Sequence, residues 1–366
     1  MKLKYLFTLF ATGLVFYSTQ AVAIILEQKA SVLTGIEYDS NPTFSTSNES
    51  LSVWRITALP TYTASLVEER NRWFTTAGLR LQRSSDSAIS ESRQDPNLII
   101  GWEHEYARGL FNITADYTKT SSRLNEFITN GVIDRDGSAT SKSISASWSR
   151  LLTERLNLSA AGQYLQIDYA GSGLSNYKTK SISSSLTYEL NEKVSPYVQV
   201  DVSKLNSETN NAQSKVSQSL VVGTKVLLRP NLNMTANVGL NRQESGNGLL
   251  ANLTMYYLAE RYSAQGSLSR NVTPSGLGQF QETNNLSLSY AYELSDKTRA
   301  GSDFAWSSNS STGGNKSLQL GGWYSKEISE LWQLKLNLNL RQLKNDSQSA
   351  NSSIIGISLN YHTPDF

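Results

Sequence analysis

The sequence contains no cysteine among its 366 residues. This absence excludes a disulfide scaffold, thiolate metal sites and thiol nucleophiles. Histidine is nearly absent as well, because only His104 and His362 occur. His104 shares the parity of Ile100 and Trp102, which predicts an interfacial position, and His362 lies near the chain end. Neither is expected to serve as a catalytic base beside a nucleophile. We therefore expect no enzyme activity and no catalytic residue.

Two groups of carboxylates allow other interpretations. Glu103 and Glu105 share one face of a predicted strand and could be glycosidase acids. Asp134, Asp136 and Gly137 resemble part of a calcium loop. We interpret the first pair as wall charges balanced by nearby Arg and Lys, and the second group as a solvated loop tip. The sequence thus predicts no cofactor and no bound metal.

Long hydrophobic runs are missing beyond the N-terminus, and the mean hydropathy is −0.36. A helix that crosses a bilayer needs about 20 consecutive apolar residues, so a helical membrane protein is excluded. Charge of one sign is also lacking, since the formal net charge is only +2. A nucleic-acid-binding domain would be expected to carry a basic footprint, so we expect no nucleic-acid partner.

The N-terminus predicts an export signal over residues 1–23. Two lysines precede an apolar run at 5–17, and Ala21-Val22-Ala23 supplies the small-residue cleavage pattern. A membrane anchor is the alternative, but the run is too short to span a hydrocarbon core of about 30 Å. Cleavage would remove two of the 33 basic residues and none of the 31 acidic ones. We expect the remaining residues, 24–366, to form one domain whose formal net charge is zero.

The most frequent pattern in the chain is the alternation of apolar and polar residues. Apolar and polar residues alternate without a break from Trp332 to Arg341, which predicts a strand with one apolar and one polar face. A polar segment at 344–352 reverses the chain, and a second alternating strand runs from Ile355 to Tyr361. A soluble β-sandwich would alternate too. The export signal, the strand length and the placement of aromatics favour a transmembrane β-barrel, where one face meets lipid and the other meets water.

The same unit of about ten alternating residues and a polar interruption recurs along the chain. We identify eighteen segments, with sixteen as the alternative. They are centred near residues 35, 57, 78, 101, 114, 144, 161, 184, 199, 221, 237, 253, 266, 287, 303, 320, 337 and 357. Short connections such as Asn191–Lys193 alternate with long polar ones such as Ser121–Gly137. Outer-membrane barrels show this pattern, with tight turns and both chain ends in the periplasm and long loops outside.

Aromatic residues gather beside the predicted short turns. Amphipathic rings favour the membrane–water interface, so we interpret them as the girdle of a barrel rather than as the general enrichment of aromatics in strands. The predicted girdle consists of Tyr62, Trp73, Tyr106, Tyr188, Tyr197, Tyr257, Tyr262, Tyr292, Tyr324, Trp332 and Tyr361, with Phe111 and Trp148 beside them.

Parity divides each predicted strand into a lipid face and a lumen face. Leu98, Ile100 and Trp102 illustrate the lipid face. Arg or Lys on that face near mid-bilayer would cost about 2–4 kcal/mol, so mid-strand charges are expected inside. The predicted lumen-lining charges are Glu37, Arg55, Arg80, Glu103, Asp116, Asp201, Lys225, Arg299, Asp303, Lys335 and Arg341. The mixture of both signs with Ser, Thr, Asn and Gln predicts a water-filled lumen without strong ion selectivity.

Two motifs resemble known families. Gly356-Ile357-Ser358-Leu359-Asn360-Tyr361 resembles the C-terminal signal that the outer-membrane barrel assembly machinery reads, although here His362–Phe366 follow it. Thr34-Gly35-Ile36-Glu37-Tyr38-Asp39-Ser40-Asn41-Pro42 resembles the Gly-x-x-Tyr-Asp-x-Asn opening of porin-like outer-membrane β-barrels that accompany exopolysaccharide synthesis systems. This resemblance implies polysaccharide transport across the outer membrane, with periplasmic polysaccharide-export proteins as partners. It assigns no catalytic residue, and we expect Asp39 and Asn41 to cap the first strand.

The sequence thus predicts an all-β, antiparallel up-and-down barrel in the outer membrane of a Gram-negative bacterium, surrounded by lipid and lipopolysaccharide. Export of an exopolysaccharide is the leading predicted function. A general diffusion porin for small solutes is the alternative, and Ser121–Gly137, which contains Leu124, Phe127 and Ile128, could fold inward to narrow such a pore. A structural or adhesive barrel is a third hypothesis, against which the bland Ser/Asn/Gly-rich loops argue.

Overall fold

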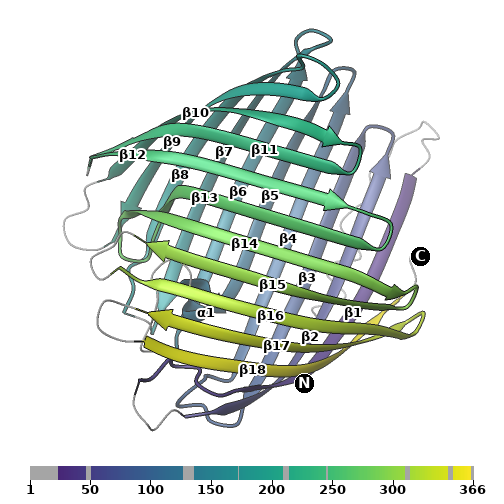
Figure 1. Cartoon of the computed structure of the whole chain (residues 1–366), viewed down its shortest axis with the longest axis vertical. Helices are drawn as coiled ribbons and strands as arrows, with labels where there is room; N and C mark the ends of the chain where they lie inside the picture. Colours follow the sequence, from purple (N-terminus) through teal and green to yellow (C-terminus); the bar gives the residue numbers. More distant parts are fainter. Residues whose placement is uncertain are drawn as a thin grey trace, which may run out of the picture.

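The computed structural model describes residues 24–46, 51–126, 136–171, 173–208, 214–244, 246–309, 314–344 and 349–363. Within these ranges the chain forms a closed antiparallel barrel of 18 strands, in which β1 pairs with both β2 and β18 (Figure 1). The strands are β1 Ile24–Asp39, β2 Val53–Glu68, β3 Asn71–Ser84, β4 Arg93–Tyr106, β5 Gly109–Ser121, β6 Ser138–Leu151, β7 Leu156–Ala170, β8 Tyr177–Tyr188, β9 Val194–Ser207, β10 Lys215–Arg229, β11 Leu232–Gln243, β12 Gly246–Leu258, β13 Tyr262–Pro274, β14 Phe280–Ser295, β15 Thr298–Asn309, β16 Lys316–Ser329, β17 Trp332–Lys344 and β18 Ser349–His362.

The predicted all-β barrel and its strand number are confirmed, and each predicted centre falls within a strand. The strands are longer than the ten residues expected, from 12 in β8 to 16 in β1. In β7 the added residues lie toward the long-loop end and include Gln166 and Asp168, whereas β1 adds Ile24, Ile25 and Leu26 at its short-turn end. The strands therefore continue beyond the apolar belt. Their backbone hydrogen bonds to neighbouring strands are favourable outside the lipid as well as within it.

The C-terminal hairpin shows how the alternation becomes a wall. Leu336 lies opposite Ile357, and Asn337 lies opposite Gly356. Apolar residues therefore meet apolar residues on one face across the pair, and a one-residue slip would exchange the two faces. The register repeats around the barrel with bulges only where a short turn follows, as between Leu227 and Arg229.

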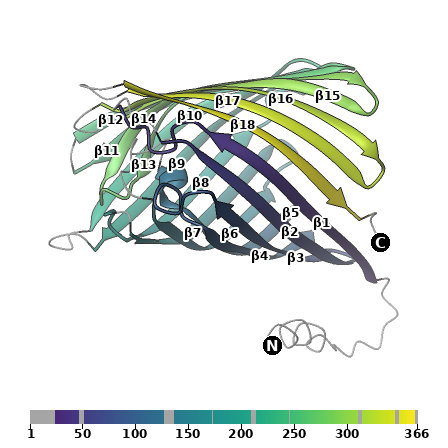
Figure 2. The same cartoon turned by 90° about the horizontal axis from the view of Figure 1, so that it is seen from below.

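Contacts across the barrel identify the inner face. The hydroxyl of Tyr169 in β7 donates a hydrogen bond to Glu126, which lies in the five-residue helix α1 (Ser122–Glu126), and Figure 2 shows α1 inside the outline of the strands. The face of Tyr169 is therefore the lumen face. On the opposite face, large apolar side chains stand unpacked by protein, with Ile182 70% and Leu240 67% exposed. This outer apolar belt is what a membrane requires.

Both ends of the barrel chain lie at the short-turn rim. The backbone N–H of Thr363, just after β18, donates to the carbonyl of Ala30 in β1 (2.9 Å). The expected position of both termini on the periplasmic side agrees with this arrangement. The predicted export signal lies outside the described residues. In the described part of the chain, no helix has the length and hydropathy needed to cross a bilayer.

Candidate functional site: the barrel lumen and its mouth

A buried ion network locks the seam where the first and last strands meet. Asp39 at the end of β1 is only 1% exposed. Arg55 donates to its Oδ2 (2.7 Å), Arg341 donates to the same oxygen (2.9 Å) and Ser352 donates to its Oδ1 (2.7 Å). Arg55 also donates from Nε to Glu37 (2.6 Å). The network joins β1, β2, β17 and β18, so three of the predicted lumen charges come together here and fasten the closure of the barrel.

The expected capping role of the first-strand motif agrees with these contacts. The backbone N–H of Asn41 donates to Asp39 Oδ1 (3.2 Å). The Asn41 amide donates to the carbonyls of Ser45 (2.9 Å) and Asn351 (3.0 Å). The motif thereby folds the β1–β2 loop back over the seam, and Phe44 of that loop packs against Leu343 and Ala350.

A second buried pair fixes the loop that precedes β6. Arg93 is 7% exposed; its Nε donates to Asp95 (2.8 Å) and its Nη1 donates to the carbonyl of Gly137 (2.8 Å). Nη1 also lies 3.7 Å from Asp136. The β3–β4 and β5–β6 connections are thus joined, and Arg123 of α1 adds a bond to the carbonyl of Ile89 (3.2 Å). Asp136 thus forms an ion pair with Arg93. Asp134 and the predicted loop tip lie outside the described residues.

Helix α1, the described start of the β5–β6 connection, lies inside the barrel, where the porin hypothesis expected this connection. From α1, Glu126 is 3% exposed and bonds to the hydroxyl of Tyr169 on the lumen face of β7. Residues 127–135, which include the predicted Phe127 and Ile128, lie outside the described residues. The inward position of α1 nevertheless narrows the lumen at its long-loop end.

A third connection reaches the same place from the far side of the barrel. The loop between β13 and β14, residues 275–279, accepts a bond from the N–H of Ser175 at the carbonyl of Gly276 (2.9 Å). Lys215 donates to the carbonyl of Gly278 (3.1 Å). Phe280, which follows this loop, packs against a buried apolar cluster of Ile167, Tyr177 and Leu205. Strands far apart in the barrel are therefore connected across its mouth.

The middle of the lumen has a charge pattern of its own. Asp116, Asp201 and Asp303 each lie within two residues of the midpoint of β5, β9 and β15. Asp116 accepts from Thr118 (3.2 Å), and Asp201 accepts from Gln199 (2.7 Å) and Ser219 (3.1 Å). Among the described residues, no Lys or Arg on the lumen face lies as close to a strand midpoint. The centre of the lumen therefore carries carboxylates without ion-pair partners.

The remaining predicted lumen charges lie on the inner face in separate settings. Arg80 is opposite Asp95, whose carboxylate is bound by Arg93 instead. Glu103 lies 3.6 Å from Arg72, and Arg299 lies 2.9 Å from Glu293. Lys335 places its ammonium 5.4 Å from the centre of the Trp323 ring. Lys225 stands opposite Thr235 near the short-turn end.

Aromatic rings from the predicted girdle lie on the outer face with one exception. Trp332 packs against Tyr361 with tilted rings (4.9 Å between ring centres), and Trp73 stacks on Trp102 (5.4 Å). Tyr197 differs, because it faces the lumen and accepts a bond from the Asn237 amide (2.8 Å).

The Tyr197 exception has a physical reason. Its ring covers Gly223, the residue directly opposite in β10, where an added Cβ would lie 2.6 Å from the ring. An aromatic ring that packs over a cross-strand glycine is stabilised by that contact and does not have to lie at the membrane–water interface. Trp323 over Gly301 follows the same pattern, and the sequence signal in both cases is parity rather than nearness to a turn.

His104 also lies outside the lumen. Its ring stacks between Trp102 (5.9 Å) and Tyr106 (6.4 Å), and its Nδ1 lies 2.9 Å from Asn71 Oδ1. The outward, interfacial position agrees with the parity of the sequence. It places the imidazole among girdle aromatics and away from the inner carboxylates.

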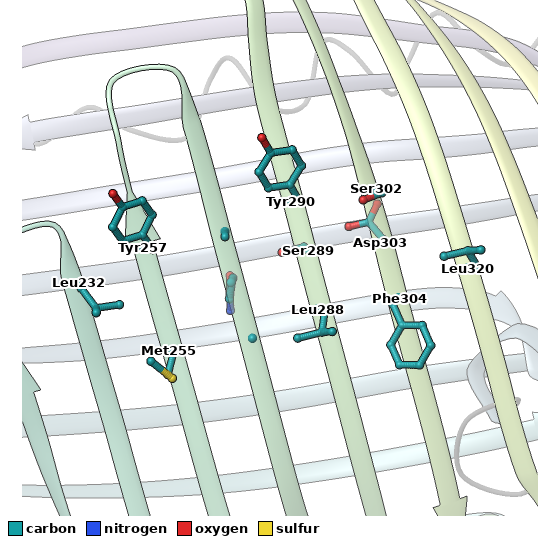
Figure 3. A pocket seen from close by; sticks show the side chains of 13 residues that line it. Leu232, Met255, Tyr257, Leu288, Ser289, Tyr290, Ser302, Asp303, Phe304 and Leu320 are labelled. Carbon is teal, nitrogen blue, oxygen red and sulfur yellow. The ribbon is translucent and has the colours of Figure 1, made fainter.

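A groove of about 430 Å³ lies on the outer face. Figure 3 shows Tyr257 and Tyr290 at one end of the groove, with Met255, Leu288 and Phe304 toward the other. The groove forms at Gly266 and Ala264, because these two residues are smaller than the residues that surround them. Because the groove lies on the apolar, lipid-facing surface, it is separate from the lumen.

Comparison with known proteins gives a fold but no family. No family model matches the sequence, and no curated protein matches it. Solved structures with a similar fold include a variant of the ferric enterobactin receptor PfeA from Pseudomonas aeruginosa, at TM-score 0.54 and 8% identity over 92% of this chain and 80% of that one. The outer membrane protein opdK from Pseudomonas aeruginosa has TM-score 0.52 and 8% identity over 93% of this chain and 99% of that one.

Another similar structure is OccAB4 from Acinetobacter baumannii, at TM-score 0.51 and 8% identity, over 93% of this chain and 98% of that one. At such low identity the likeness concerns the fold. It agrees with the closed strand order and the apolar outer belt described above. The chain therefore has the closed barrel fold of the outer-membrane proteins of Gram-negative bacteria.

Proposed function

We propose that the barrel is a diffusion channel for small polar solutes and that its lumen favours cations over anions. The observation that carries the proposal is the polar lumen with three mid-strand carboxylates, Asp116, Asp201 and Asp303. Carboxylates at a narrow, water-filled level attract cations and repel anions, since their field is less screened there than in open solvent. The likeness in fold to opdK, named as an outer membrane protein, supports a channel over an enzyme.

The mouth argues for small solutes over a polymer. Three connections pack into it: the loop that carries Phe44, helix α1, and the loop at 275–279. Their contacts are partly buried and include the Glu126–Tyr169 bond. A polysaccharide chain would need these contacts to open along its whole passage, whereas a small solute needs only the space between them. Export of an exopolysaccharide, with periplasmic export proteins as partners, is the alternative that the same experiments test.

The direct test is conductance of the purified protein in planar bilayers across a KCl gradient. We expect open channels whose zero-current potential reports a preference for K⁺. Neutralising the three carboxylates together (D116N, D201N and D303N) is expected to shift that potential toward zero, with channels still open. Asp296→Asn, in the β14–β15 turn outside the lumen, serves as the matched control and should leave the potential unchanged.

The polymer alternative needs a cellular experiment. In a deletion strain we expect surface and secreted polysaccharide to be unchanged and uptake of small charged solutes to fall. Loss of polysaccharide that returns with the wild-type gene would favour export and overturn the diffusion channel. A closed protein in bilayers, with both solute uptake and polysaccharide unchanged in cells, would contradict both transport hypotheses and favour the structural or adhesive barrel.

A further inference from the structure

Four lysines lie on the outer face at the long-loop ends of strands between β6 and β9. Lys142 belongs to β6, Lys178 and Lys180 to β8, and Lys204 to β9. Lys180 lies directly opposite Lys204 in the register. Side chains so placed have Cβ atoms about 4.5–5.5 Å apart, and like charges at that position repel. The fold thus holds two ammonium groups together on a surface that faces the membrane.

Carboxylates in the neighbourhood do not neutralise the pair. Asp168 lies 3.1 Å from Lys142 and also accepts from the Gln166 amide (2.9 Å). Glu208 accepts from Asn176 (2.9 Å). Within the part of the chain that the structure describes, Lys180 and Lys204 form no ion pair with a carboxylate. An anion from outside the protein would therefore find two unneutralised donors already side by side.

The depth of the four lysines in the membrane can be estimated along strand β8. The outer face of β8 presents Tyr188, Leu186, Ile182, Lys180 and Lys178 in that order from the short-turn end. At about 3.3 Å per residue, Tyr188 and Lys180 are roughly 27 Å apart along the strand, which a tilt of about 40° reduces to roughly 20 Å along the membrane normal. Lysine stems that extend further outward then bring the ammonium groups to the edge of an apolar band of about 25 Å.

The same face changes character between its two ends. At the short-turn end it carries the aromatic girdle, including Tyr188 (42% exposed), and at mid-strand it carries Ile182 and Val202 (70% and 42% exposed). On β8 and β9 the long-loop end carries Lys178, Lys180 and Lys204 on this face. A second opposed pair, Lys316 and Lys344, lies at the corresponding ends of β16 and β17. On β8 the outward side chains therefore change from aromatic at the short-turn end to cationic at the long-loop end.

We propose that the Lys142–Lys178–Lys180–Lys204 cluster binds the phosphate groups of a phosphorylated glycolipid of the outer leaflet, of the lipid A kind. The outer leaflet of the outer membrane meets the barrel at the long-loop end, and phosphates lie at the boundary of its apolar region. Ammonium groups bind phosphate by charge-assisted hydrogen bonds, and each lysine near an anionic lipid surface adds to the attraction. The opposed lysines give this glycolipid a fixed position on β8 and β9, independent of what passes through the lumen.

The test is native mass spectrometry of the purified barrel with diphosphorylated lipid A, alongside the same lipid after removal of its phosphates. We expect the wild-type protein to retain the phosphorylated lipid and to lose about tenfold in affinity in the K180Q/K204Q variant. The K180R/K204R variant should keep the affinity. The matched control is K297Q/K326Q, which removes two lysines at the short-turn rim and should bind as the wild type does.

Three outcomes would overturn the proposal. Equal retention of phosphorylated and dephosphorylated lipid would show binding through acyl chains alone. Wild-type affinity in K180Q/K204Q would remove the cluster from the binding surface. Full displacement of lipid A by inorganic phosphate at millimolar concentration would show a site for a small anion rather than for a glycolipid. A gel shift on boiling verifies that each variant is a folded barrel, and Lys204→Gln alone replaces the double variant if that one fails to fold.

Discussion

At the scale of single residues, the most consequential side chain is Asp39. The sequence assigned it a capping role, and the structure adds a buried carboxylate bound by two arginines and a serine. A carboxylate that is 1% exposed survives as an ion only with such partners, because burial of an isolated charge is costly. The arginines depend on it equally, since Arg55 and Arg341 have side chains only 14% and 15% exposed.

Asp39→Asn is expected to destabilise the barrel by about 3 kcal/mol, because it leaves two buried guanidinium groups short of their counter-charge. Unfolding in urea, followed by loss of the heat-modifiable gel species, measures the change. Asp303→Asn is the control: it removes an inward aspartate without an ion pair and should leave the midpoint in place. Equal midpoints for D39N and the wild type would mean that the seam network does not hold the barrel closed.

At the scale of one element, parity decides the role of each residue in a strand. Ile182 and Ser183 are neighbours at the middle of β8, and they lie on opposite faces. Ile182 is 70% exposed on the outer face, while Ser183 lies opposite Asp201 on the lumen face. The same alternation places Tyr197 inside, where Val198 (38% exposed) next to it faces lipid.

Ile182→Arg is expected to cost about 2–4 kcal/mol of folding free energy, because it places a cation in the lipid near the bilayer midplane. Ser183→Arg, one residue further on, should be tolerated beside Asp201 and should lower the preference for cations. Folding into lipid vesicles in a urea series gives the first value, and the zero-current potential gives the second. Similar stabilities for the two arginine variants would contradict the assignment of faces.

The mouth supplies the second prediction at this scale. Deleting Gly276–Gly278 leaves Ser275 and Gln279 as a two-residue turn between Pro274 and Phe280, which already lie opposite each other, so the hairpin can close without the loop. The contacts with Ser175 and Lys215 would be lost. Single-channel conductance is expected to rise. Lys215→Gln, which removes only the bond to Gly278, should produce a smaller rise, and unchanged conductance in both would mean that this loop does not limit the pore.

At the scale of the whole molecule, closure is the property that makes the chain a membrane protein. Eighteen strands pair in order, and β1 joins β18 over nine consecutive residue pairs. Closure removes every free strand edge, which is required where lipid offers no hydrogen-bond partner. Such a barrel resists detergent until it is boiled.

Unboiled protein is therefore expected to migrate faster than boiled protein on a detergent gel. The Leu359→Pro variant, which removes one backbone donor from β18, the strand that pairs with both β1 and β17, should lower the temperature at which the shift occurs. Asp296→Pro is the control, because Asp296 lies in the turn between β14 and β15 and its substitution takes no donor from a strand ladder. Absence of any shift in the wild type would count against the barrel.

Much of this protein is determined by the sequence alone. The period of two, the alternation of short and long connections and the confinement of mid-strand charges to one parity specify an eighteen-stranded barrel with a polar lumen. These signals are local, since each depends on a few residues along the chain and on the cost of placing a polar group in lipid. They identified the lumen parity of Glu37, Arg55 and Arg341 without indicating that the three would meet.

Only the tertiary structure decided how distant segments combine. Asp39 and Arg341 are 302 residues apart and meet because the barrel closes. Glu126 meets Tyr169, and the loop at 275–279 meets Ser175, because loops cross the mouth. Lys180 and Lys204 become a pair only through the register of β8 and β9. Closure, register and loop packing are set by contacts between strands, and a pattern read along one strand cannot contain them.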